Sequence, residues 1–307
     1  MRNDLIFRVT VCAGAAMFGL SVAAGAAQFT YNGFSNTTGL TFVGDANTAV
    51  TSDGTVLRVT PAIGGQSGAV YSTSAFTLGA NDTFSTQFQF RFTNPGAWDP
   101  ADGITFVLAA SPTGLGSGGV GMGYSGVPNS VAIEFDTYNN AGFGLGDNDG
   151  NSSNHVSIDT DGNLTNTALA NVYGNGSCGF ANGNPPQNPQ TADGCMSNGH
   201  LWTANMSYNG TDLTVALRDP SMASEFVAIN SYAIDIASYL GTNSAYVGFT
   251  AGTGAGWENH DIVNWTFANT AQIPQSSVPE PGSISLLSAG VLMLAVAAAR
   301  RRFRRQN

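Results

Sequence analysis

Two acidic side chains, Glu134 and Asp136, are spaced so that they can hold a cation between them. They lie in residues 131–138, where Val, Ile, Phe and Thr alternate with Ala, Glu, Asp and Tyr, and this period of two predicts a β-strand. Alternate residues of a strand share one face and lie roughly 6.6 Å apart, so the two carboxylates can converge on one or two cations. Oxygen ligands favour calcium, and the imidazole of His155, further along the chain, favours a transition-metal ion beside it.

The charge of the chain agrees with a cation at this position. Residues 28–271 contain 18 Asp and Glu against three arginines, Arg58, Arg91 and Arg218, and the whole chain has no lysine. A divalent metal is therefore the expected counter-charge of the two carboxylates. The same shortage of basic residues argues against nucleic acid as a partner, because nucleic-acid binding depends on Lys and Arg contacts to phosphate. Divalent cations and neutral, hydroxyl-rich ligands remain compatible with this composition.

The stretch that contains the two carboxylates resembles the metal loop of the legume-type (L-type) lectins. That loop reads Glu-x-Asp-x-(Tyr/Phe)-x-Asn, followed by an Asp and then by a His that opens a short apolar strand. The residues that match this pattern are, in order, Glu134, Asp136, Tyr138, Asn140, Asp149 and His155.

The resemblance implies two metal ions in this loop. Calcium would be bound by the side chains of Asp136, Asn140 and Asp149 and by the backbone carbonyl of Tyr138. A second, Mn²⁺-like transition ion would be bound by Glu134, Asp136, Asp149 and His155. The loop between the strand and His155 is longer than in the plant proteins, so Asp147 is the alternative to Asp149 as the bridging carboxylate. We expect Asp149 to fill this role.

Two further segments resemble sugar-binding loops of the same family. The run Ala-Asp-Gly-Ile-Thr-Phe-Val-Leu-Ala at residues 101–109 is similar to the segment whose Asp accepts hydrogen bonds from sugar hydroxyls, and Asp102 occupies that position. In the family the Ala-Asp peptide bond is cis. The glycine-rich residues 116–124 are similar to a loop in which one glycine lets the backbone approach the sugar. Gly119 is the expected residue, and Gly118 is the alternative.

The segment 247–267 resembles the closing signature of the family, in which a strand and a turn precede a variable loop, His-Asp-Ile and a Trp-containing strand. The variable loop sets sugar selectivity in such lectins, which implies that Ala255 and Gly256 contact the ligand. Trp257 could stack on the face of a pyranose ring, although an aromatic residue beside a β-turn more often packs against the protein.

The rest of the chain predicts an all-β fold. Short alternating segments separated by Gly, Asn and Asp favour an antiparallel jelly-roll sandwich, and no stretch between the two ends of the chain shows a helical period. The segments predicted as strands are residues 29–34, 55–60, 69–72, 83–93, 103–110, 130–138, 155–159, 201–208, 212–219, 245–250 and 262–268.

Two cysteines, Cys178 and Cys195, lie in an excursion at residues 166–199 that is rich in Gly, Asn and Pro. An even pair in an exported chain predicts a disulfide. A two-cysteine metal site is the alternative, and it lacks a second pair of ligands. We therefore interpret the excursion as a disulfide-pinned loop inserted between strands.

Both ends of the chain resemble targeting segments. Residues 1–27 read as a secretory signal peptide, with Arg2 and Arg8 before a small-residue cleavage site near Ala26 or Ala27. Residues 272–283 read as a linker with a Pro-Glu-Pro motif, followed at 284–307 by a short apolar span and an arginine-rich tail. This arrangement resembles the PEP-CTERM sorting signal of Gram-negative envelope proteins, which implies an exosortase-type processing enzyme as a partner. A generic transmembrane anchor is the alternative.

Together these features predict an exported, calcium-dependent carbohydrate-binding protein and not an enzyme. Its lectin-like domain would span residues 28–271, and its partner would be a glycan or exopolysaccharide. It would lie in the cell envelope or extracellular matrix, transiently anchored in the inner membrane. A structural or adhesion protein with a degenerate sugar site is the first alternative. A laminarinase-like glycoside hydrolase is the second, but Tyr138 and Asn139 stand where that family carries a further Glu.

Overall fold

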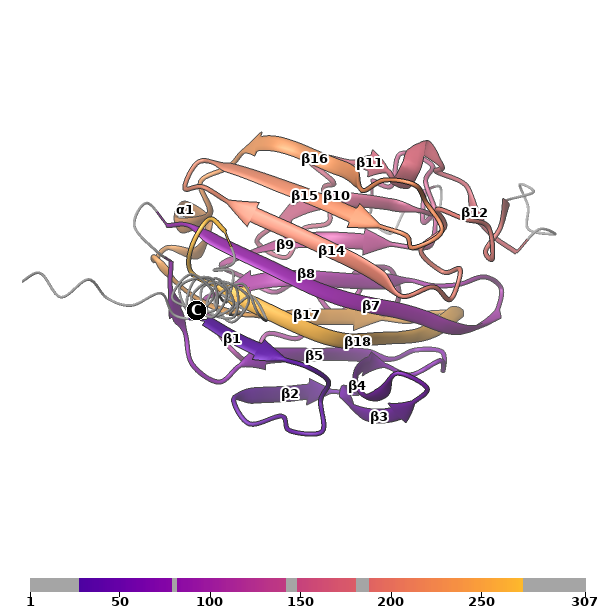
Figure 1. The fold of residues 1–307 in the computed structure, drawn as a ribbon, viewed down its shortest axis with the longest axis horizontal. Coiled ribbons are helices and arrows are strands. Elements are labelled where there is room, and N and C mark those ends of the chain that lie inside the picture. The colour runs from indigo at the N-terminus through magenta and orange to yellow at the C-terminus, as the bar shows by residue number, and fades with distance from the viewer. Residues whose placement is uncertain (1–27, 79–81, 142–147, 181–187, 273–307) are drawn as a thin grey trace, which may run out of the picture.

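The computed structural model describes residues 28–78, 82–141, 148–180 and 188–272. Two large antiparallel sheets lie one over the other (Figure 1), which confirms the predicted all-β sandwich. The predicted signal peptide and the predicted C-terminal span lie outside the described residues. Within the described ranges, no helix is long and apolar enough to cross a membrane.

The first sheet contains eight strands in the order β16-β15-β14-β7-β18-β4-β3, and β1 pairs with β18 beside this path. Their bounds, in the same order, are Phe226–Ala233, Asp212–Arg218, Trp202–Tyr208, Phe84–Ala97, Gly256–Ala268, Gly54–Thr60, Asn47–Thr51 and, for β1, Gln28–Tyr31.

The second sheet also contains eight strands, in the order β11-β10-β9-β8-β17-β5-β2, and β6 pairs with β17. Their bounds, in the same order, are Ala170–Asn171, His155–Thr160, Ser130–Asp136, Gly103–Ala109, Ser244–Gly252, Ser67–Ser72, Leu40–Gly44 and, for β6, Phe76–Thr77. The remaining elements are the parallel pair β12 (Cys178–Gly179) and β13 (Asn188–Pro189), the 3₁₀ helices η1 (Gly119–Gly121) and η2 (Val172–Gly174), and the helix α1 (Ile236–Leu240).

Aromatic side chains join the two sheets. Alternate residues of β7 point inward and are fully buried, and Phe88 is the central one. Its ring lies 4.9 Å from that of Phe249 on β17 and 5.7 Å from that of Phe135 on β9, both edge to face. This is the favoured geometry of aromatic pairs. The core therefore fixes β9 and β17, whose ends carry the candidate site.

The register of the second sheet gathers several loops at one end. Gly103, the first residue of β8, is paired with Asp136 at the end of β9 and with Gly252 at the end of β17. His155, the first residue of β10, is also paired with Asp136. The loops that enter β8 and β10 and the loops that leave β9 and β17 therefore meet at this end of the sheet.

The expected strands are all present, and the unpredicted ones lie mainly at sheet edges. β3 and β16 form the two ends of the first sheet, and β2 forms one end of the second. An edge strand has one neighbour and buries less surface, so its apolar alternation is weak. β3, for example, is exposed at three of its five residues. The short α1 was also unpredicted, because five residues are too few to show a helical period.

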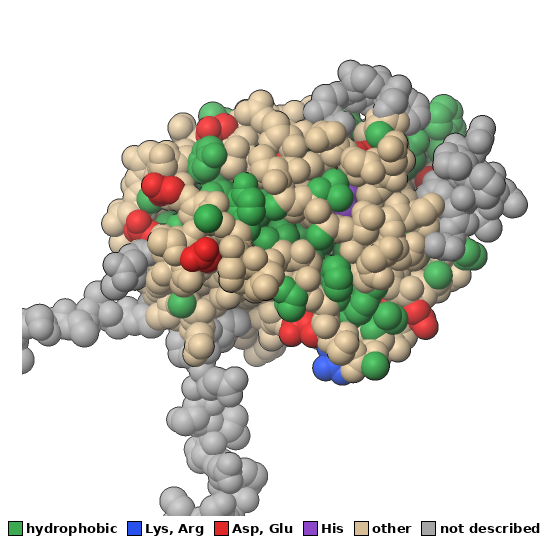
Figure 2. Space-filling view, turned by 90° about the horizontal axis from the view of Figure 1, so that it is seen from above, with side chains coloured by type: hydrophobic (Ala, Val, Ile, Leu, Met, Phe, Trp, Pro, Cys, Tyr) green, Lys and Arg blue, Asp and Glu red, His purple; other side chains and the backbone are tan. Residues whose placement is uncertain are grey.

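The acidic surplus of the chain is only partly neutralised in the fold. Arg58 forms a two-point ion pair with Asp261, and Arg91 forms one with Asp53. Two of the three basic residues between the chain ends are therefore already paired. On the face shown in Figure 2, acidic side chains are scattered over the surface and basic ones are few.

Candidate metal and sugar site

Glu134, Asp136 and His155 form a buried cluster on two neighbouring strands. Along β9, Val131, Ile133 and Phe135 enter the core, so the intervening Glu134 and Asp136 occupy the opposite face, as the alternation predicts. All three members of the cluster are fully buried, and they can present ligand atoms within 4.8 Å of one another. Buried charges in proteins are paired or coordinate metals, and this mixture of carboxylates and imidazole suits a transition ion.

The contacts within this cluster already bring the ligands together. His155 Nε2 lies 3.0 Å from Glu134 Oε1, and Asp136 Oδ1 accepts a hydrogen bond of 2.7 Å from the backbone N–H of Tyr138. That second bond turns the chain back toward the cluster directly after β9. The carbonyl of Tyr138, which is predicted to bind calcium, therefore belongs to a residue that is hydrogen-bonded to Asp136, a second predicted ligand.

Asn140 and Asp149 lie beside the cluster in the loop between β9 and β10. The carboxylate of Asp149 accepts a hydrogen bond from the backbone N–H of Asn140, and both residues are buried. Asn140 Oδ1 is buried and has no hydrogen-bond partner among the described residues. A buried amide oxygen next to carboxylates fits a calcium ligand. The alternative bridging residue, Asp147, lies outside the described residues.

A pocket of about 420 Å³ opens next to these residues. It brings together all five residues predicted to contact sugar, from four separate loops. Its lining consists of Trp98, Ala101, Asp102, Gly118, Gly119, Val120, Tyr138, Asn140, Gly254, Ala255 and Gly256. Asn140 belongs both to this lining and to the predicted calcium ligands, so the metal loop and the pocket share a side chain.

Backbone bonds hold Asp102 at the floor of the pocket. The peptide between Ala101 and Asp102 is cis, as the resemblance implied. The N–H of Asp102 donates to the carbonyl of Gly252 (3.1 Å), and its own carbonyl accepts from the N–H of Thr137 (2.9 Å). Asp102 is 4% exposed. These bonds tie the loop before β8 to the ends of β17 and β9.

Gly119 contributes the space left by its missing side chain. Its φ of +58° lies in the left-handed region, where glycine is favoured. A Cβ at this position would lie 4.0 Å from Asp102 Oδ2 and 3.6 Å from Gly254 Cα, which are ordinary contacts, so the backbone conformation is what favours glycine here. The N–H of Gly119 donates to the carbonyl of Thr253 (3.1 Å), and it is therefore already engaged within the protein.

Two tryptophans near the pocket have different roles. Trp257 packs against the end of β7, where a Cβ added to Gly96 would lie 2.2 Å from Trp257 Nε1. It is not among the residues that line the pocket. Trp98 lines the pocket and is 68% exposed. Trp98 was not among the predicted site residues. The signal that could have indicated it is an unaccompanied Trp in the polar run Asn-Pro-Gly-Ala-Trp-Asp-Pro.

Glu258 on β18 supports the pocket from within the protein. Its Oε1 accepts hydrogen bonds from Thr137 Oγ1 (2.7 Å) and from Ser197 Oγ (3.0 Å), and its side chain is fully buried. Thr137 lies between two predicted calcium ligands, and Ser197 belongs to the predicted insertion. Glu258 thus joins the metal loop to that insertion, a link that the sequence analysis did not anticipate.

The predicted disulfide between Cys178 and Cys195 is present, with a Cα–Cα distance of 5.8 Å. The insertion that it closes also contacts the turn before β8, because the N–H of Phe180 donates to the carboxylate of Asp99. Asp99 lies next to Trp98 in the chain. The insertion therefore braces the pocket at two points, one at Asp99 and one at Glu258.

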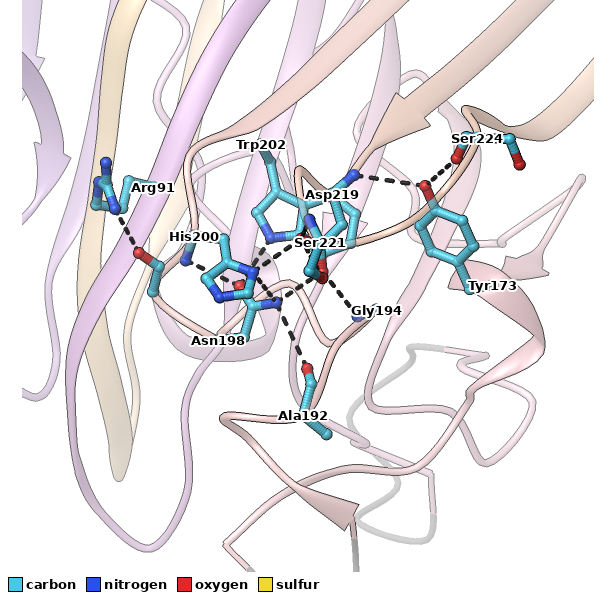
Figure 3. Close-up of polar contacts among 11 residues, drawn as sticks. Arg91, Tyr173, Ala192, Gly194, Asn198, His200, Trp202, Asp219, Ser221 and Ser224 are labelled. Atoms are coloured by element: carbon cyan, nitrogen blue, oxygen red, sulfur yellow. Dashed lines mark hydrogen bonds and ion pairs between the residues drawn. The ribbon is translucent and has the colours of Figure 1, made fainter.

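A second group of possible metal ligands consists of Asp193, His200 and Asp219. Figure 3 shows His200 and Asp219 with their hydrogen-bond partners. Asp219 Oδ2 accepts hydrogen bonds from the N–H of Gly194 and from Asn198 Nδ2, both at 2.8 Å. Its Oδ1 lies 2.8 Å from His200 Nδ1. Both oxygens are thus engaged within the protein, and Asp219 acts as an anchor of the insertion.

The pKa of Asp219 reflects this anchoring role. Burial alone would raise the pKa, but hydrogen bonds from the N–H groups of Gly194 and Ser221, from His200 and from the Ser221 hydroxyl outweigh that effect. The pKa of Asp219 therefore lies below its usual value.

Comparison with known proteins places this geometry in a family. The family model described as the legume lectin domain matches residues 26–282. The seed lectin of Styphnolobium japonicum is 31% identical over 202 residues, which are 62% of this chain and 58% of that protein. The lectin of Pisum sativum is 29% identical over 198 residues, 60% of this chain and 61% of that protein. The chain thus spans about three fifths of the length of these relatives.

Solved structures show the same fold. A lectin from Bauhinia forficata in complex with GalNAc aligns with a TM-score of 0.60 at 22% identity, covering 79% of this chain and 97% of that one. Basic winged bean lectin with Tn-antigen aligns with a TM-score of 0.61 at 24% identity, covering 79% and 98%. The relatives are lectins, in agreement with the expectation that this chain is not an enzyme.

Proposed function

This chain belongs to the legume lectin domain family, and we propose that it is a calcium-dependent carbohydrate-binding protein. The observation that supports this most is the pocket itself. Its lining combines Asp102, Gly119 and Asn140 with a turn that contains Ala255 and Gly256. A concave site with a few convergent polar groups is the usual form of a small-ligand site.

The predicted ligands fit two metal ions. Asp136, Asn140, Asp149 and the carbonyl of Tyr138 would hold calcium, since the set is all oxygen and the amide oxygen of Asn140 is buried beside it. Glu134 and His155 would complete a second, Mn²⁺-like site with Asp136 and Asp149. When bound, these cations supply fixed positive charge that neutralises the buried carboxylates and cross-links the loop after β9.

The side chains of the pocket would recognise a pair of neighbouring sugar hydroxyls. Asp102 accepts hydrogen bonds from both hydroxyls, and the Asn140 amide nitrogen donates to one of them while its oxygen faces the cation. Both side chains are nearly buried and held by backbone bonds. A clamp that is formed before the ligand arrives avoids part of the ordering cost of binding.

The two ends of the sequence support a place outside the cytoplasm. Residues 1–27 would direct export, and residues 272–307 would anchor the chain transiently in the inner membrane until an exosortase-type enzyme processes it. The mature domain would then bind a glycan or exopolysaccharide in the cell envelope or extracellular matrix. A structural or adhesion protein with a degenerate site remains the competing function.

Substitution of Asp102 by Asn distinguishes the two functions. Asp102→Asn keeps the shape of the side chain but replaces an acceptor by a donor, so one sugar hydroxyl would face a like partner. We expect glycan affinity, measured by glycan array and calorimetry, to fall about tenfold or more, since an unsatisfied polar contact costs ~1–3 kcal/mol. Calcium affinity and the melting temperature should stay close to those of the unsubstituted protein.

The matched control is Asp161→Asn, the same change at an exposed position after β10. It should leave glycan binding unchanged. Chelation with EDTA should abolish binding and lower the melting temperature of the unsubstituted protein. Unchanged glycan binding in Asp102→Asn, or unfolding of that variant, would place the sugar site elsewhere, and unchanged stability after chelation would reject the role of calcium.

A further inference from the structure

Trp98 exposes a large apolar ring at the pocket. Of the four tryptophans in the chain, Trp202 and Trp265 are fully buried and Trp257 is half-buried, whereas Trp98 is 68% exposed. Contact of an indole ring with water is unfavourable. The described part of the fold leaves this ring uncovered, so the free energy of covering it is available to a ligand.

The turn that carries Trp98 is fixed on both sides. Before it, Gly96 lies against the ring of Trp257 so closely that no side chain would fit. After it, the carboxylate of Asp99 accepts a hydrogen bond from Phe180, and Asp102 is bonded to the end of β17. The Trp98 backbone is therefore anchored before the ligand binds, which lowers the ordering cost of a contact with its ring.

The pocket has polar groups at its floor and this ring at its mouth. Asp102 and Asn140 are 4% and 5% exposed, against 68% for Trp98. The volume of about 420 Å³ falls in the range of roughly 300–1,000 Å³ that encloses drug-sized ligands. A disaccharide is of that size, whereas one pyranose ring engaged by Asp102 and Asn140 would leave part of the space unfilled.

We infer that Trp98 forms a second subsite, on which the sugar unit next to the one held by Asp102 stacks its apolar face. The ligand is accordingly a neutral oligosaccharide and not a free monosaccharide. The lining contains one carboxylate and no basic side chain, which disfavours an anionic sugar. This inference rests on the proposed function, because it takes Asp102 as the residue that holds the first sugar unit.

The test compares matched probes by calorimetry. The methyl glycosides of galactose, glucose and mannose are titrated beside disaccharides that carry the same terminal sugars. We expect the unsubstituted protein to prefer the disaccharide. Trp98→Ala should lower the disaccharide affinity about five- to tenfold, as loss of aromatic stacking implies, and should change the monosaccharide affinity less than about twofold. Trp98→Phe should retain most of the disaccharide affinity, because a flat ring remains.

Val50→Ala is the control, since Val50 on β3 is an apolar residue that is 85% exposed and does not line the pocket. It should change neither affinity. Equal disaccharide affinity in Trp98→Ala and the unsubstituted protein would overturn the second subsite. Equal losses of monosaccharide and disaccharide affinity in Trp98→Ala would also overturn it. Either result would leave the lectin function standing. Binding of neither probe class by the unsubstituted protein would reject the proposed function together with this inference.

Discussion

Replacement of Glu258 by Ala should destabilise the domain by about 3–6 kcal/mol. The side chain is fully buried, and its Oε1 accepts hydrogen bonds from Thr137 Oγ1 at 2.7 Å and Ser197 Oγ at 3.0 Å. A hydrogen bond to a charged group contributes ~1.5–3 kcal/mol to stability, so two such bonds give the stated range. Both donors are themselves nearly buried, and water therefore cannot readily replace the carboxylate.

The assay is urea denaturation of the mature domain followed by tryptophan fluorescence, with calorimetry as a second measurement. For a domain of this length, ~1 kcal/mol shifts the melting temperature by about 2–4 °C, so a fall of roughly 6–24 °C is expected. Glu258→Gln is the matched variant, because its amide oxygen can still accept both bonds, and it should lose less than half as much stability. A change below about 1 kcal/mol in Glu258→Ala would refute the view that this carboxylate joins the metal loop to the insertion.

Two further outcomes can be measured on the same domain. Replacing Cys178 and Cys195 by Ser should lower the free energy of unfolding by about 3 kcal/mol, as loop closure over the separation of 17 residues implies. Two titratable thiols in the unsubstituted protein, denatured without reduction, would contradict the disulfide. Because the pKa of Asp219 is depressed in the fold, its contribution is complete above its unfolded pKa of about 3.8 and is lost as pH falls through the lower folded value. Asp219→Asn should therefore flatten the acid limb of stability measured against pH, and an unchanged limb would contradict this.

The cluster of Glu134, Asp136 and His155 was predictable because much of its geometry is local. A period of two along β9 is enough to place Glu134 and Asp136 on one face. The position of His155 followed from the resemblance, and the register that pairs it with Asp136 provides the physical reason.

The five residues predicted to contact sugar were also named from motifs. The register at the ends of β8, β9 and β17 explains why the loops that carry Asp102, Asn140 and Ala255 meet. The loop of Gly119 reaches the same place through a backbone hydrogen bond to Thr253.

Trp98 and Glu258 were missed because their roles depend on distant partners. Glu258 is 121 residues from Thr137 and 61 from Ser197, and no local pattern marks such a contact. The exposure of Trp98 depends on where its turn lies relative to loops elsewhere in the chain. The sequence named Trp257 as a possible sugar platform but favoured packing, and its close contact with Gly96 agrees with packing.

The course of β18 determines which way the pocket is presented. Its first residue, Gly256, lines the pocket, and its last, Ala268, is paired with Gln28 at the start of the domain. Twelve steps of ~3.3 Å separate these two ends by roughly 40 Å. Gln28 and Ala268 therefore lie side by side, at the end of the strand remote from the pocket. A surface that holds the domain by either end would leave the pocket facing outward, accessible to large, branched or immobilised polymers.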